Sequence, residues 1–182
     1  VDFIARNMFY EGDFDANNIL PPVCFAIGED PKTLAPSPTS PQPQAKTCAE
    51  CPMNAFGSKG NGKACKNERM LAVLPPDADA DTPMWTASVS PTGIKGFDGY
   101  VSGVARTFGT PPVGVITSMG LDDTKTYASL VFSEPAPNPN TADHFARQDE
   151  AHDLLTVEPD LTARTAAKPA GKVAAKRPPI RR

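Results

Sequence analysis

The four cysteines of this 182-residue chain restrict its fold more than any other feature. Two of them form a Cys48-x-x-Cys51 pair, a glycine-rich stretch separates this pair from Cys65, and Cys24 lies a long connection upstream. Thiolates two residues apart can occupy two corners of a tetrahedron, so the pattern predicts a metal-binding loop. Four thiolates complete a closed shell without an open coordination position, which favours a structural role over catalysis. We therefore expect one ion to be held by Cys24, Cys48, Cys51 and Cys65.

Zinc is the expected ion, because irregular four-cysteine loops in small proteins are typical zinc sites. An iron–sulfur cluster uses the same ligands and stays open as the alternative. Two disulfides are disfavoured because no secretory signal opens the chain. A thioredoxin-like redox pair is disfavoured because the sequence after Cys51 does not continue as a helix.

Twenty-one prolines predict short elements and many loops, because proline removes a backbone donor from helices and ladders. Five prolines fall within residues 30–44, where we expect an irregular excursion. Apolar patterns predict strands over residues 1–10, 69–74 and 84–90 and a hairpin joining residues 113–121 to 127–133, which prolines 135, 137 and 139 should end. An apolar stripe predicts a helix over 92–108, and a second helix is expected over 142–155.

This order of elements predicts a β-rich α+β fold, either a small OB-like barrel or an antiparallel sheet, with two helices. The expected domain spans residues 1–159, with the four-cysteine metal loop inserted at 24–65. The chain opens inside a strand-like run, so we expect further strands to precede Val1 in the full protein. Residues 160–182 should form a disordered basic tail.

The charge is divided unevenly along the chain. Residues 161–182 carry seven basic side chains and no acid, while the remaining 160 residues hold 11 basic and 21 acidic side chains, a net charge of −10. An acidic body with a basic tail excludes a large basic nucleic-acid platform. No run of about 18 apolar residues occurs, so no membrane segment is expected.

The cysteine loop is locally basic, with a net charge of +3 between residues 45 and 69. Basic groups that follow phosphates, beside aromatic rings on which bases stack, are typical of single-stranded nucleic-acid binding. A solvated surface loop, with Phe56 packed beneath the metal, explains the same residues equally well. The candidate nucleic-acid contacts are Lys59, Lys63, Lys66, Arg69, Phe9, Tyr10 and Phe56.

No serine, cysteine or histidine arrangement in the sequence forms a nucleophile–base pair, so an enzyme is not predicted. His144 and His152, the only histidines, lie eight residues apart on the second expected helix. They are interpreted as ordinary helix-surface residues rather than ligands or a base.

The segments FYEGDF, PPVCF, CAECPMNAFGSKGNGKAC and LAVLPP, in this order, resemble a group of small four-cysteine proteins encoded by tailed bacteriophages. The resemblance extends over about residues 1–132, is specific at the cysteine core, and does not cover the proline-rich insert or the basic tail. It rests on Phe9, Tyr10, Cys24, Cys48, Cys51, Pro52, Asn54, Phe56, Gly57, Ser58, Gly62, Lys63, Ala64 and Cys65.

The resemblance implies a non-catalytic single-stranded DNA-binding protein that acts in phage replication or recombination in the host cytoplasm. Its implied partners are single-stranded DNA and phage or host replication proteins, and a homo-oligomer is left open. The alternative is a virion component or a phage factor that docks on a host protein, which the acidic body favours.

Overall fold

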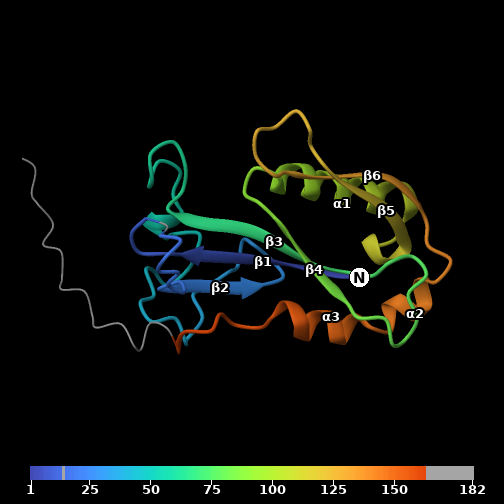
Figure 1. Ribbon diagram of the computed structural model, residues 1–182, viewed down its shortest axis with the longest axis horizontal. Helices are drawn as coiled ribbons and strands as arrows, with labels where there is room; N and C mark the ends of the chain where they lie inside the picture. The colour runs from blue at the N-terminus through green and yellow to red at the C-terminus, as the bar shows by residue number, and fades with distance from the viewer. Residues whose placement is uncertain (14, 163–182) are drawn as a thin grey trace, which may run out of the picture.

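The computed structural model describes residues 1–13 and 15–162, and its centre is an open, four-stranded antiparallel sheet (Figure 1). The strands β1 (Asp2–Phe9), β2 (Cys24–Gly28), β3 (Cys65–Val73) and β4 (Trp85–Val89) lie in the order β2-β1-β3-β4. A second sheet pairs β5 (Val115–Leu121) with β6 (Leu130–Pro137). The helices are α1 (Ile94–Phe108), α2 (Thr141–Phe145) and α3 (Gln148–Leu155), and η1 (Pro52–Asn54) and η2 (Pro112–Gly114) are single 3-10 turns.

The prediction of a β-rich α+β fold with an antiparallel sheet is confirmed. Within residues 1–13 and 15–162 the strands form no closed barrel, because β2 and β4 are the opposite edges of one sheet and β5 and β6 pair only with each other. None of the described helices is long and apolar enough to cross a bilayer. The expected basic tail lies mostly outside the described residues.

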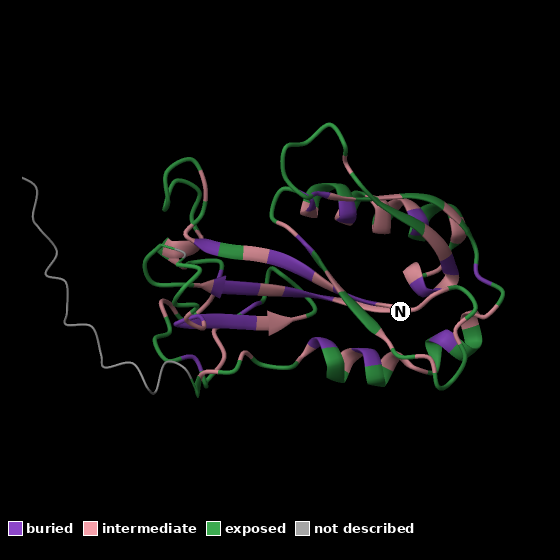
Figure 2. Ribbon diagram, in the orientation of Figure 1, coloured by how far each residue is buried: buried purple, intermediate pink, exposed green. Residues whose placement is uncertain are grey.

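The two faces of the four-stranded sheet are covered by different elements, as the buried residues in Figure 2 indicate. On one face, Ile4 and Ala72 pack against Leu155 of α3. On the other face, Leu71 and Val89 pack against Phe97 of α1. Successive strand residues point to opposite faces, so each central strand must be apolar on both sides.

The predicted helix over 92–108 is observed as α1. Phe97 and Val104 of its apolar stripe are buried, and Gly109 ends the helix in a left-handed conformation with φ of 64°. Glycine adopts this conformation without a Cβ penalty, which makes it the favoured residue after a helix end.

The second predicted helix is wrong as a single element, because residues 142–155 divide into α2 and α3. The chain turns at Arg147, whose guanidinium donates to the carbonyl oxygens of Asp79 and Thr82. These long-range hydrogen bonds fix the position of the break between α2 and α3, which local helix propensity does not predict.

The hairpin is confirmed, but the expectation that prolines end it is wrong. Strand β6 continues through Pro135 to Pro137. Glu134 has a positive φ of 51°, and the register shifts between Ile116 and Ser118, so the strand is irregular where the prolines enter. Prolines are tolerated in such irregular edge strands because no ladder donor is required of them there.

Strand β2 was not predicted, and β3 begins at Cys65 rather than at residue 69. Both differences come from pairing with β1, which holds Cys24 on one side of Phe9 and Cys65 on the other. Consequently these two cysteines are strand residues of the sheet, and the connection between β2 and β3 carries the other two.

The proline-rich residues 30–44 are irregular, as predicted, but they pack along β2. Ser37 and Gln42 donate backbone N–H groups to Phe25 and Val23 at 2.8 Å. The Ser40 hydroxyl bonds both the N–H and the carbonyl of Phe25 at 3.0 Å. The segment thus satisfies backbone groups on the outer edge of β2 that would otherwise lack partners.

Glu68 of β3 is a buried carboxylate, 1% exposed, at the centre of an ion network. Arg6 Nε donates to its Oε1 at 2.6 Å, and Lys66 Nζ and Ser88 Oγ donate to its Oε2 at 2.8 and 3.1 Å. Burial alone would raise the pKa of Glu68, but the hydrogen bonds and charges of Lys66 and Arg6 lower it on balance.

We expect Glu68→Gln to lower the free energy of unfolding by about 3 kcal/mol, because it leaves a largely desolvated Arg6 without its anion. The folded pKa lies below the ordinary value of 4.5, so the carboxylate contributes above that pH and its contribution disappears as the pH falls through the folded pKa. Denaturant unfolding between pH 3 and 7 measures both effects. The exposed Glu150→Gln, which breaks a surface pair with Arg147, is the matched control and should change little. A Glu68 variant as stable as the control contradicts the expectation.

Candidate metal centre

The four cysteines come from separate positions in the chain and line one small cavity at an end of the four-stranded sheet. Cys24 and Cys65 are the first residues of β2 and β3, while Cys48 and Cys51 belong to the connection between these strands, just before η1. All four thiols are free, so the disulfide alternative is not observed.

The pairing of β1 brings Cys24 and Cys65 onto the same face. Phe9 lies in register with both of them, and residues directly opposite one another in a sheet point to the same side. Neighbouring strands are about 4.8 Å apart, so the two cysteine backbones are separated by roughly 10 Å with Phe9 between them.

Backbone hydrogen bonds place Cys48 and Cys51 over this face. The Cys48 N–H donates to Leu34 O at 2.8 Å, and the Cys51 carbonyl accepts from Asn54 N at 3.0 Å. The Asn54 side chain donates to Cys48 O at 2.8 Å, which closes the turn between the two cysteines.

A chain of polar side chains connects this turn to the sheet. Lys63 Nζ donates to the Oδ1 atoms of Asn54 and Asn67 at 3.2 and 3.0 Å, and Asn67 Nδ2 donates to Asn7 Oδ1 at 2.6 Å. Asn7 also lines the cysteine cavity. The sequence did not single out Asn7 and Asn67 as part of the site, because both are polar residues of strands that also carry charged side chains.

The cavity disfavours negative charge when no cation is present. Burial raises the pKa of Cys48, and an Asn7 hydrogen bond offsets part of the effect. Burial, reinforced by the charges of Cys48, Cys51 and Cys24, raises the pKa of Cys65 from 9.0 to about 12. At neutral pH Cys48 and Cys65 are therefore protonated, and a bound cation must displace their protons.

A metal site requires suitable donor atoms and also a suitable arrangement of these atoms in space. Among the described residues, no group of three or more His, Cys, Asp or Glu side chains is placed to hold a metal ion. Four soft thiols that line one cavity are the donor set that zinc and iron–sulfur clusters use. Thus the donors fit such a centre, and the sulfurs must move closer together to bind one ion.

The candidate nucleic-acid residues divide into two groups. Phe56 and Tyr10 are 80% and 41% exposed, and Lys59, Lys63 and Lys66 are exposed as well. Lys59 pairs with Asp13 at 3.0 Å and Lys66 pairs with Glu68, so part of their charge is compensated.

The other two candidates are turned inward. Arg69 is 8% exposed, and its guanidinium makes two bonds to the Asp98 carboxylate of α1, at 3.1 and 2.9 Å. Phe9 is half-buried and lines the cysteine cavity. Neither side chain is available as an outer contact in this structure.

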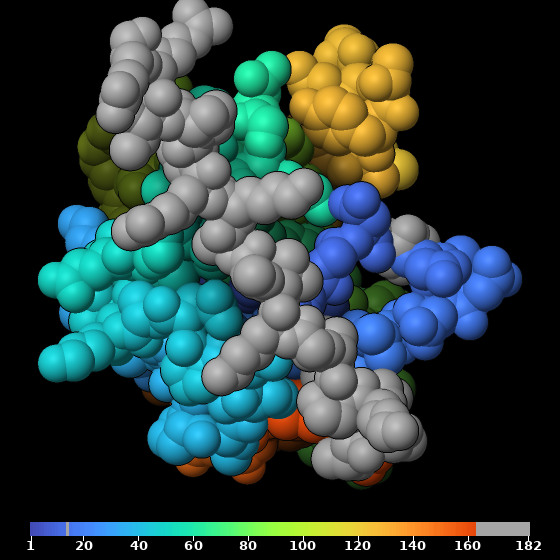
Figure 3. Space-filling model, turned by 90° about the vertical axis from the view of Figure 1, so that its left-hand side faces the viewer, coloured from blue at the N-terminus to red at the C-terminus, as the bar shows by residue number. Residues whose placement is uncertain are grey.

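Seen from the end of the molecule, the cysteine-bearing connection and the loop that follows β1 project on opposite sides (Figure 3). A cleft between these segments is lined by Tyr10, Lys59 and Lys66, together with acidic residues that include Glu11 and Asp13. Three of the exposed candidates, Tyr10, Lys59 and Lys66, therefore border a cleft of mixed charge.

The comparisons with known proteins add no relative. No protein-family model, curated protein or solved structure matches the chain.

We expect the metal-free thiols to react with iodoacetamide at different rates at pH 8. Cys51 is the most accessible of the four and should react first, whereas Cys65, with a pKa of about 12, should react slowest because the thiolate is the nucleophile. Mass spectrometry of timed digests measures the order, and denaturant should equalise the rates. Equal rates in the folded protein would show that the thiols do not share a buried cavity.

Proposed function

We propose that this chain is a non-catalytic, single-stranded DNA-binding protein whose fold contains a structural zinc centre. The observation that carries the proposal is the convergence of all four cysteines on one cavity, next to exposed aromatic and basic side chains. The proposed zinc ligands are Cys24, Cys48, Cys51 and Cys65.

The zinc proposal rests on electrostatics and on topology. Four thiolates cannot share a buried cavity without a cation, and Zn²⁺ compensates their charge as it displaces their protons. The ion would join the first residues of β2 and β3 to the turn that carries Cys48 and Cys51. A closed tetrathiolate shell leaves no coordination position for a reacting water, so the centre supplies stability rather than chemistry.

The DNA proposal rests on the side chains around the zinc loop. Phe56 and Tyr10 offer ring surfaces to unstacked bases, and Lys59 and Lys63 offer charge to phosphates. The basic residues of the C-terminal segment add sequence-independent attraction, while the acidic body restricts binding to this end. OB-like proteins bind single strands on a curved antiparallel sheet. Here α3 and α1 pack on the two faces of the four-stranded sheet, so the proposed DNA surface is the loop region at its cysteine-bearing end.

The biological setting follows the resemblance in the cysteine core. We place the protein among replication or recombination factors of tailed phages, acting in the host cytoplasm, where thiols stay reduced and available to metal. Phage or host replication proteins are the proposed protein partners.

A second candidate function is docking on a protein, as a virion component or a host-directed factor. The pairing of Lys59 with Asp13 and of Lys66 with Glu68 favours it, because these pairs weaken the positive field of the zinc loop.

Protein purified without chelator should contain one zinc ion per chain, measured by elemental analysis. Cys24→Ser and Cys65→Ser should each lose most of the metal, because a missing thiolate opens the shell. Glu50→Gln, which changes an exposed side chain between Cys48 and Cys51 but no ligand, is the matched control. A brown preparation that absorbs visible light would show that the centre is an iron–sulfur cluster and not zinc. A full metal content in both cysteine variants would contradict the four-sulfur centre.

Fluorescence anisotropy with a labelled single-stranded oligonucleotide tests the DNA proposal. We expect binding at low salt and an affinity that falls with added salt, because each neutralised phosphate releases a counterion. Phe56→Ala should weaken binding by about 1–3 kcal/mol if its ring stacks on a base.

Trp85→Ala is the control for Phe56→Ala, because Trp85 is a second exposed aromatic residue, 60% exposed. It pairs with Val73, at the opposite end of β3 from Cys65. An equal loss of DNA affinity in the two variants would show that Phe56 is not a specific part of the proposed surface. Absence of binding at low salt would exclude DNA and leave the protein-docking candidate.

A further inference from the structure

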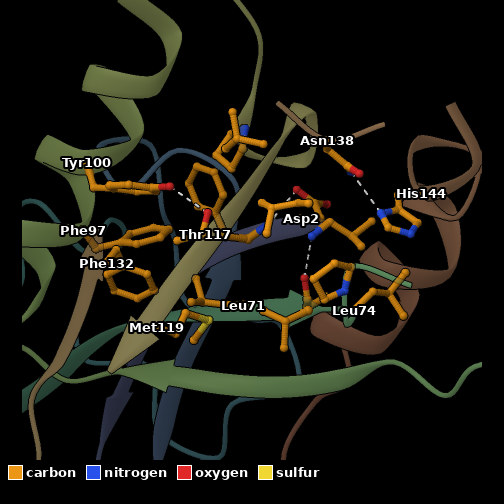
Figure 4. Close-up of a pocket in the computed structure, with 18 residues that line it drawn as sticks. Asp2, Leu71, Leu74, Phe97, Tyr100, Thr117, Met119, Phe132, Asn138 and His144 are labelled. Atoms are coloured by element: carbon orange, nitrogen blue, oxygen red, sulfur yellow. Dashed lines mark hydrogen bonds between the residues drawn. The ribbon is translucent and has the colours of Figure 1, made fainter. Parts of the chain in front are cut away.

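A pocket far from the cysteines lies between the four-stranded sheet and the second sheet (Figure 4). Its walls come from the start of β1, the end of β3, α1, both strands of the second sheet and α2. The cavity volume is about 150 Å³. A volume of about this size holds one benzene ring, although the lining of this open pocket also includes Val1 and the acidic Asp2.

One wall of the pocket is aromatic. The rings of Phe97 and Phe132 meet edge to face with centroids 5.0 Å apart, and Tyr100 lies against Phe132 with a centroid distance of 5.8 Å. Leu71 and Met119 complete this part of the lining. A planar aromatic guest extends such a cluster favourably, because aromatic rings prefer edge-to-face and offset contacts.

A pair of hydroxyl groups lies at one end of the pocket, where Figure 4 draws Tyr100 bonded to Thr117. The two oxygen atoms are 2.7 Å apart. Two hydroxyls carry two protons, and their mutual bond uses one of them. The second proton has no acceptor within the described part of the chain, so this end of the pocket offers a free donor.

His144 lies at the opposite end and offers a second donor (Figure 4). Asn140 N donates to Asn138 Oδ1, and Asn138 Nδ2 donates to Val113 O, so the orientation of the Asn138 amide is fixed. The same Nδ2 is 3.1 Å from His144 Nδ1, which must therefore accept. The ring proton is then on Nε2, which is buried and has no partner among the described residues.

This environment overturns the expectation that His144 is a surface residue, since it is only 6% exposed. The buried Nε2 donor of His144 costs free energy because buried polar groups require partners, whereas the Tyr100–Thr117 pair is only part-buried. A guest that is flat and apolar but carries one hydrogen-bond acceptor can meet the hydroxyl donor beside the aromatic wall.

We infer that this pocket binds a small aromatic molecule, about one ring in size, through the wall of Phe97, Phe132 and Tyr100, with a carbonyl-type acceptor facing the hydroxyl donor of the Tyr100–Thr117 pair. The inference is independent of the proposed zinc and DNA functions, because the pocket shares no residue with the cysteine cavity. A failure of either proposal therefore leaves the other unaffected.

The test compares acetophenone with ethylbenzene, which has a similar shape but no acceptor, in NMR titrations of the isotope-labelled chain. Acetophenone should shift the signals of pocket residues and bind about threefold to tenfold more tightly than ethylbenzene. This is the difference in affinity that one hydrogen bond contributes. Tyr100→Phe should remove part of this preference without weakening the binding of ethylbenzene.

Met119→Trp is a second variant, because Met119 is 40% exposed at the pocket and a larger ring there should fill the cavity and abolish binding of both compounds. Phe56→Ala, in the cysteine-bearing connection, is the control and should bind like the parent chain. Equal affinities for the two compounds would contradict the proposed hydrogen bond to the acceptor of the guest. Absence of shifts at pocket residues would contradict binding in this pocket.

Discussion

The pairing of β1 with a strand on each side is the constraint on which the rest of the structure depends. It places Cys24 and Cys65 on either side of Phe9, so that two distant cysteines point to one face of the sheet. The same strand contributes Ile4 and Phe3 to the two apolar clusters that hold α3 and α1. Any change in the register of β1 would move its side chains to the wrong face and separate the cysteines.

The structure consequently has two candidate sites at opposite ends. At one end the cysteine cavity is bordered by exposed aromatic and basic groups, and at the other an aromatic pocket lies between the two sheets. Ion pairs lie between these two ends. The buried Glu68 pairs with Arg6 and Lys66 on one face of the sheet, and the buried Arg69 pairs with the half-exposed Asp98 on the other. Arg69 is thus better explained as part of the packing of α1 than as a nucleic-acid contact.

The sequence predicted features that depend on local pattern. The stripe of α1 and the central strands follow from residue spacing. It did not predict β2, which is only five residues long and exists through its pairing with β1. Nor did it predict that Arg147 divides the last helix or that His144 is buried, because both depend on contacts with residues distant in sequence.

X-ray absorption spectroscopy of the zinc-loaded protein tests the central claim most directly, because it reports the type and number of ligand atoms around the ion. The account predicts four sulfur ligands at about 2.3 Å. A shell that contains nitrogen or oxygen ligands in place of any of the four sulfurs, or a protein that does not retain zinc, would contradict it.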